Sequence, residues 1–362
     1  MSCIVCTSEI IKNVNDSEEH IIPNAIGGIK KVKGFICATC NNTAGNTWDN
    51  EVADQLASFC NMLNINRDRG EVQDLIVEQT NGNQLTLKPN GVMHPIKPEV
   101  KINGGVYDIQ ARDKKEARKI LTGLYRKYKK DGSEISDIVD NLPVRRQYLD
   151  SPLHFRLNLG GTDAGRSYVK TALALIHSQK SSELVCDIGI AYLNNSHHDR
   201  IWGYYFDEMD VILNRNIDIP LHCVHINASG SKGKVIAYIE YFSILKIVVL
   251  LSNNFSGIDQ SVTYALDPTT GKELNVVVES QNLHEIIHDI ISDQYRNYEI
   301  VENNVNNVLR IISEKAQEQE LGRIVERIFN ELSKEGSVDQ QKVSQVVHEQ
   351  AHDFFLHLLK RE

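Results

Sequence analysis

Residues 37–42 read CATCNN and residues 3–6 read CIVC, so a C-x-x-C pair occurs twice within the first forty residues. Each pair can place two thiolates on one face of a tight turn. In a reducing compartment, two such pairs favour one tetrahedral zinc site over disulfides. We therefore expect Cys3, Cys6, Cys37 and Cys40 to hold a structural zinc ion. The alternative is two unrelated pairs of buried cysteines.

The segment between the two pairs, SEEHIIPNAIGG at residues 17–28, places a carboxylate beside a histidine. Glu19 and His20 precede a stiff Ile-Ile-Pro step and a glycine pair. A zinc ion bound by both C-x-x-C pairs would close this segment into a loop. Histidine has a pKa near neutrality and can activate water, so chemistry at this loop is plausible.

The order C-x-x-C, E-H-I-I-P, G-G and C-x-x-C-N resembles the HNH endonuclease family in its zinc-stapled ββα-metal form, over about residues 1–60. The resemblance implies that Glu19 and Asn41 hold a catalytic divalent cation and that His20 takes a proton from the attacking water. Glutamate replaces the commoner aspartate at Glu19. The family's middle asparagine would fall near residues 32–33 and is not evident, so its role passes to a backbone carbonyl or to Asn42.

The residue types agree with this chemistry. Hydrolysis of a phosphodiester needs a base and a hard cation that offsets the charge developing on the phosphate. Oxygen ligands such as Glu19 and Asn41 suit Mg²⁺ or Mn²⁺, whereas thiolates suit zinc, so two different metals are expected. Asp49 lies eight residues after Asn41 on the same side of an expected helix, and it is a further candidate ligand or a solvated carboxylate. The plainer alternative for His20 is a hydrogen bond to the backbone.

Length and composition indicate more than one domain. The chain has 362 residues, of which 41% are hydrophobic and 24% charged, and its net charge is -9. No apolar run is long enough for a membrane span, and the N-terminus lacks the pattern of a secretory signal, so we expect a cytoplasmic protein without membrane contact. Residues 101–180 carry 16 Lys and Arg against 9 Asp and Glu, and a basic helix is expected at 112–132. Nucleic acid would meet this segment, if the charge is more than a solvated surface.

The expected fold class is α+β, in three parts. Residues 1–100 form the HNH nuclease domain with a β-rich extension, 101–300 a mixed α+β regulatory or recognition domain, and 301–362 a C-terminal helical hairpin. The resemblance implies DNA as substrate. At the family level it also suggests a role in bacterial anti-phage defence. An activating ligand or partner protein would bind the central domain, and a homo-oligomer is an alternative to a single chain.

Two other classes remain alternatives. One is a zinc-stapled module that binds nucleic acid or a partner without catalysis. The other is a metalloprotease, because HEIIH at 284–288 and HEQAH at 348–352 match the H-E-x-x-H pattern. Context argues against the protease: the second motif has only ten residues after it, and the first lacks an evident third ligand.

Overall fold

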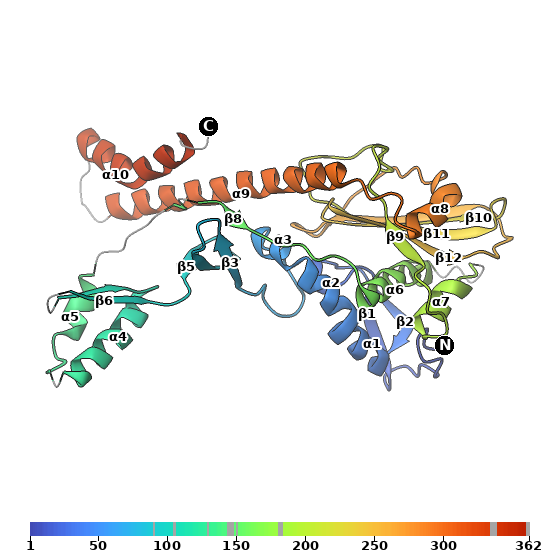
Figure 1. The fold of residues 1–362 in the computed structure, drawn as a ribbon, viewed down its shortest axis with the longest axis horizontal. Helices are drawn as coiled ribbons and strands as arrows, with labels where there is room; N and C mark the ends of the chain where they lie inside the picture. Colours follow the sequence, from blue (N-terminus) through green and yellow to red (C-terminus); the bar gives the residue numbers. More distant parts are fainter. Residues whose placement is uncertain are drawn as a thin grey trace. The chain divides into compact units, whose positions relative to one another are not determined.

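The structure is a computed structural model that describes residues 1–89, 91–103, 106–128, 130–142, 148–149, 151–179, 184–333 and 339–359 (Figure 1). The chain divides into two compact units, each made of two separate stretches. Unit 1 comprises Met1–Gln73 and Leu157–Glu314, and unit 2 comprises Asp74–Arg156 and Lys315–Glu362. These breaks do not coincide with the boundaries expected near residues 100 and 300, and the three-part division stays a prediction.

The first stretch of unit 1 is a two-stranded antiparallel sheet followed by short helices. Its elements are β1 (Asp16–His20), η1 (Asn24–Ile26), β2 (Lys31–Cys37), α1 (Ala38–Ala44), η2 (Gly45–Asp49), α2 (Asn50–Gln55) and α3 (Ala57–Met62). The sequence predicts one helix here. The structure instead has a π-helical turn at η2, whose i→i+5 bonds insert an extra residue, and a break at Leu56. The apolar side chains of Trp48, Val52 and Phe59 are nevertheless buried.

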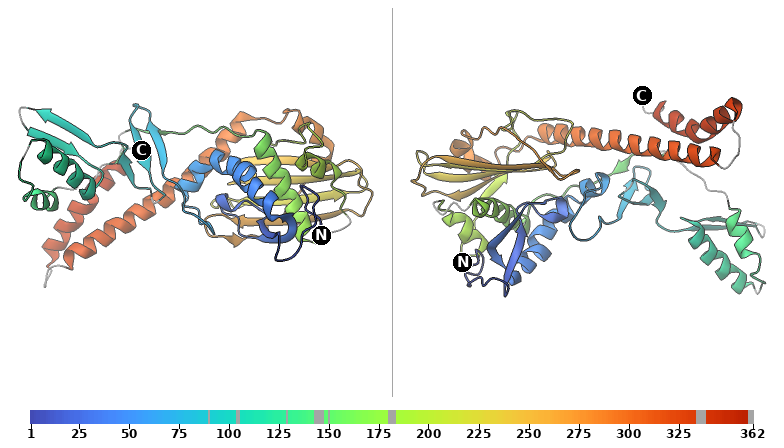
Figure 2. Two further views of the ribbon diagram at one scale, coloured as in Figure 1. Left: turned by 90° about the horizontal axis from the view of Figure 1, so that it is seen from below. Right: turned by 180° about the vertical axis from the view of Figure 1, so that it is seen from behind.

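The second stretch of unit 1 contains a six-stranded antiparallel sheet of strand order β14-β13-β10-β11-β12-β9. Its elements are α6 (Thr162–Ser178), α7 (Asp187–Leu193), β9 (Trp202–Tyr204), β10 (His222–Ser229), β11 (Lys234–Tyr241), β12 (Leu245–Ser252), β13 (Gln260–Asp267), β14 (Lys272–Glu273), α8 (Leu283–Ile291) and the start of α9 (Tyr298–Leu332). Figure 2 (left) shows the central strands side by side.

The central strands β10, β11 and β12 are buried on both faces of the sheet. Side chains alternate across each strand, so each face packs against a different cluster. Ile226, Ala237 and Val249 are neighbours across β10, β11 and β12, and they share one apolar cluster with α6 and with the first stretch. Tyr238 and Val248 belong to the opposite cluster, which α8 covers. The helix α6 therefore lies between the sheet and the β1–β2 segment, a position that matters for the candidate site below.

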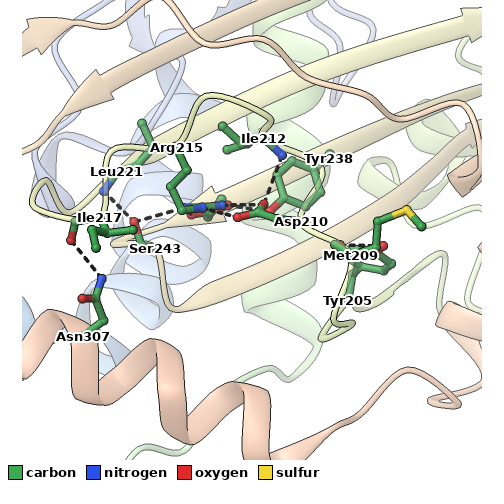
Figure 3. Close-up of polar contacts among 11 residues, drawn as sticks. Tyr205, Met209, Asp210, Ile212, Arg215, Ile217, Leu221, Tyr238, Ser243 and Asn307 are labelled. Carbon is green, nitrogen blue, oxygen red and sulfur yellow. Dashed lines mark hydrogen bonds and ion pairs between the residues drawn. The ribbon is translucent and has the colours of Figure 1, made fainter.

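A buried ionic cluster fixes the loop between β9 and β10 (Figure 3). The Arg215 guanidinium donates to both carboxylate oxygens of Glu240, at 2.6 and 2.8 Å, and also pairs with Asp210. The Tyr238 hydroxyl donates to Glu240, whose side chain is fully buried. Burying these charges is tolerated because every partner is paired and hydrogen-bonded. Asn307 of α9 donates to the carbonyl of Ile217 in the same loop.

Unit 2 consists of small sheets and helices. Its elements are β3 (Leu75–Gln79), β4 (Gln84–Leu87), β5 (Met93–Pro95), β6 (Glu99–Asn103), β7 (Val106–Gln110), α4 (Lys114–Lys127), α5 (Ile135–Asp140), β8 (Leu153–His154), the end of α9, and α10 (Gln340–Leu359). The helix α4 is the expected basic helix. Ile324 on α9 packs with Ala351 and Phe354 on α10, so the C-terminal helices are confirmed, as is the mixed α+β class. No helix in the described part of the chain has the length and apolar character of a membrane span.

His222 joins the two stretches of unit 1. Its Nε2–H donates to the carbonyl of Ile26 at 2.8 Å, and its Nδ1 accepts from the backbone N–H of Phe242 at 3.0 Å. This pair of bonds requires the neutral imidazole, and the side chain has no exposed surface. Burial accordingly lowers the pKa of His222 to about 4.

We expect the folded state to lose stability as the pH falls. The pKa of His222 is lower in the folded chain than in the unfolded chain, so the unfolded chain binds the proton first as the pH falls. The contribution of His222 to the free energy of unfolding is therefore complete above pH 6.5 and is lost between pH 6.5 and about 4. For His222 the loss is on the order of 3 kcal/mol. Apparent melting temperatures between pH 7 and pH 4 measure the effect.

The variant His222→Gln keeps an N–H donor but does not titrate, so its melting temperature should fall less steeply with acid than that of the parent. Burial also lowers the pKa values of His225 and His284 to about 4, so these residues account for the remaining dependence of the melting temperature on pH. His198→Gln, at an exposed histidine, is the matched control and should keep the full slope. An unchanged slope in His222→Gln would contradict the assignment.

Candidate metal centre and active site

The four cysteines of the two C-x-x-C pairs converge at one point. The sulfurs of Cys3, Cys6, Cys37 and Cys40 all lie within 4.8 Å of one another, and no disulfide joins them. Cys6 Sγ and Cys37 Sγ are 3.8 Å apart. A tetrahedral zinc ion with Zn–S bonds of about 2.3 Å requires sulfur separations of about 3.8 Å, so the donor set fits zinc. Hydrogen bonds from Ser8 lower the pKa of Cys6 to about 6, which favours the thiolate.

The local backbone explains this convergence. Cys3 and Thr7 close a tight turn through a Thr7 N–H bond to the carbonyl of Cys3. Cys37 ends β2 and is the N-cap residue of α1, so Cys40 follows one turn into that helix. Gly28 permits the chain reversal between the strands, because a Cβ there would lie 1.8 Å from the Ile22 carbonyl oxygen. Both cysteine pairs are thereby held at the same end of the β1–β2 sheet.

The structure brings together three of the residues predicted to act on a catalytic cation. Glu19 on β1 is only 4% exposed, and its carboxylate accepts a hydrogen bond from the Asn41 side chain of α1. Asn41 Nδ2 also donates to the carbonyl of Glu18 at 3.2 Å. Asp49, on η2, is linked to Glu19 through a residue that sequence reasoning missed, Lys170.

Lys170 lies on α6 and is completely buried. Its ammonium contacts Glu19 Oε1, and it lies 2.5 Å from Asp49 Oδ2. The Ser167 hydroxyl, one turn earlier on α6, donates to the other Asp49 oxygen at 2.7 Å. Burial raises the pKa of Glu19, which Lys170 opposes. Burial also disfavours the charged form of Lys170, but Asp49 and Glu19 more than offset it, so the pKa of Lys170 is raised.

His20 has a different neighbour. Its Nε2 lies 3.2 Å from Asp68 Oδ2, and Lys31, opposite His20 on β2, holds the same carboxylate at 2.6 Å. Burial lowers the pKa of His20, which keeps the imidazole neutral at pH 7. Asp68 gave no sequence signal, because it follows the helices in an ordinary charged turn.

The two H-E-x-x-H motifs do not form a metal site in the described residues. On α8, His284 is buried while His288 is exposed, and Glu285 pairs with Lys232 at 2.7 Å. His348 and His352 lie side by side on α10. Within the described part of the chain, the four-cysteine cluster is the only group of three or more metal-ligand residues found together. The protease alternative therefore gains no support.

The part of the chain that holds the cysteine cluster also matches a known family. Residues 3–57 match the HNH endonuclease family. The match spans the four cysteines, Glu19, His20, Asn41 and Asp49, and it ends before Asp68 and Lys170. Searches of curated proteins and of solved structures find no match to this chain. Residues 3–57 are called the HNH segment from here on.

Metal analysis tests the cysteine cluster. The purified chain should contain about one zinc ion, and Cys37→Ser should lose most of it, because a tetrahedral structural site needs all four thiolates. Cys186→Ala is the matched control: Cys186 is buried but lies outside the cluster, so its zinc content should equal that of the parent. Zinc retained in full by Cys37→Ser would show that the cluster does not bind the ion.

Proposed function

We propose that this protein is a metal-dependent endonuclease that hydrolyses phosphodiester bonds in DNA. The observation that carries the proposal is the meeting of Glu19, Asn41 and Asp49 beside the four-cysteine cluster, inside the HNH segment. The order β1, β2, α1 is also the order of elements in a ββα-metal module. The cysteine cluster would then hold structural zinc, and the catalytic cation would be separate.

The donor set fits a hard divalent cation. Glu19 and Asn41 offer oxygen atoms, which suit Mg²⁺ or Mn²⁺, and Asp49 offers a further carboxylate. A positive group already lies among these oxygens, since the Lys170 ammonium contacts both carboxylates. We propose that Glu19 and Asn41 hold the cation. When bound, it supplies positive charge that offsets the charge developing on the phosphate.

His20 is suited to the role of general base. Asp68 is an acceptor, so it holds the proton of the neutral imidazole on Nε2 and leaves the lone pair on Nδ1. That lone pair can take a proton from water. Asp68 thereby orients His20, the role for which the sequence offered Asn42 or a backbone carbonyl. Asp68 is itself fixed by Lys31 and by a bond from its backbone N–H to the Asn24 side chain.

The remainder of the chain is assigned to recognition or control. The α4 helix carries Lys and Arg side chains on its exposed surface, which suits contact with a phosphate backbone. A ligand or partner protein at the central region, self-association, a cytoplasmic location and a role in anti-phage defence stay predictions.

One observation favours a second candidate function. Lys170 neutralises part of the charge on Glu19 and Asp49, as it would in a zinc-stapled module that binds nucleic acid without cutting it. The two functions differ in whether His20 matters. In a binding module, His20→Ala would leave every activity unchanged.

A plasmid-nicking assay with Mg²⁺ or Mn²⁺ tests the nuclease. We expect His20→Ala to slow cleavage by about 100-fold or more, because it removes the general base. Asp68→Asn should retain part of the activity, since it weakens the orientation of the imidazole and leaves the ring in place. His198→Ala, at an exposed histidine, is the matched control and should cut normally. Cleavage by His20→Ala at the parent rate would reject the proposed role, provided that its zinc content is intact.

A further inference from the structure

Lys170 occupies an unusual position for a lysine. The helix α6 is buried along most of its length, including the positions on either side of Lys170. A charged group without exposed surface is stable only if it is paired and hydrogen-bonded. Both of its partners, Glu19 and Asp49, belong to the HNH segment, whereas Lys170 lies more than one hundred residues beyond the end of that segment.

The charges of this cluster do not balance. Two carboxylates face one ammonium, so with both acids ionised the Glu19–Lys170–Asp49 cluster carries one net negative charge. Asp49 has a second fixed partner in the Ser167 hydroxyl, which also comes from α6. Glu19 has its second partner in Asn41, which comes from α1 of the HNH segment. The ammonium thus lies between one carboxylate anchored to its own helix and one carboxylate of the proposed cation site.

This arrangement leads to a proposal that rests on the proposed function. We propose that Lys170 competes with the catalytic divalent cation for the Glu19 carboxylate. When the cation occupies Glu19, the Lys170 ammonium stays paired with Asp49. Glu19 and Asn41 then face the cation, and Asp49 with Ser167 faces Lys170. In this assignment Asp49 retains the Lys170 ammonium and is not a metal ligand. The helix α6 therefore sets the cation concentration at which the site fills.

Cation binding without nucleic acid tests the proposal. Free Mn²⁺ is measured by electron paramagnetic resonance during titration of the full, zinc-loaded chain. Lys170→Met removes the competitor and should tighten Mn²⁺ binding by about tenfold or more. Asp49→Asn removes the carboxylate that retains the ammonium. The ammonium then stays on Glu19, so Mn²⁺ binding should weaken. These opposite directions distinguish competition from a structural role, because damage to the fold would weaken binding in both variants.

The double variant separates the two roles open to Asp49. If Asp49 acts mainly through Lys170, Asp49→Asn should weaken Mn²⁺ binding much less in the Lys170→Met background than in the parent, since only the loss of a nearby negative charge remains. If Asp49 is itself a ligand, Asp49→Asn should weaken Mn²⁺ binding at least as much in the Lys170→Met background as in the parent, and the assignment of Asp49 as the residue that retains Lys170 is overturned. The double variant keeps one buried carboxylate and no ammonium, so its cluster has the same net charge as that of the parent. It therefore keeps the proposal testable if Lys170→Met alone fails to fold.

A charge control is provided by Lys31→Met. Lys31 pairs with Asp68 beside His20, so its removal deletes a nearby positive charge without freeing Glu19, and its effect on Mn²⁺ affinity should be much smaller than that of Lys170→Met. Equal affinities in the parent and Lys170→Met would overturn the competitor while leaving the nuclease proposal intact. An absence of Mn²⁺ binding in both, at millimolar Mn²⁺, would reject the cation site and the competitor together.

Discussion

Four sulfur atoms within 4.8 Å of one another close the first forty residues into a loop, and the proposed active site depends on that closure. Glu19 and His20 lie on the strand inside the loop, and Asn41 follows directly after its last cysteine. A segment of this size buries too little apolar surface to be stable without help. A metal ion held by the four cysteines would supply part of that help. The rest comes from the large sheet and α6, against which Ile21, Ile22 and Ile26 are completely buried.

The same packing explains why the candidate site is not confined to the HNH segment. Because α6 lies between the sheet and β1, a polar side chain on its inner surface must find a partner among the residues of β1 and η2. Lys170 finds Glu19 and Asp49, and Ser167 finds Asp49. His222 makes the corresponding link from β10, through the carbonyl of Ile26. The residues that would bind a cation are therefore held by elements from both stretches of unit 1.

The sequence predicts the parts of this arrangement that depend on local spacing. Two C-x-x-C pairs predict the cysteine cluster, which the structure confirms. The resemblance carried by the order of motifs implies that Glu19 and Asn41 share a cation site, which stays a proposal. Partners that come from distant elements leave no such signal: Lys170 reads as one polar residue in an apolar helix, and Asp68 as one of several charges in a turn. The π-helical turn at η2 and the discontinuous units were also missed, because both depend on packing that a one-dimensional pattern does not record.

The separation of Lys170 from its partners also has a consequence during synthesis. The ribosome adds Lys170 about 120 residues after Asp49, and the strands that cover Ile26 come later still. At roughly 5–20 residues per second, the nascent HNH segment spends on the order of ten seconds with its acidic pair lacking the lysine. Translation order therefore places the HNH segment outside the ribosome well before Lys170 and the covering strands are available to complete its packing.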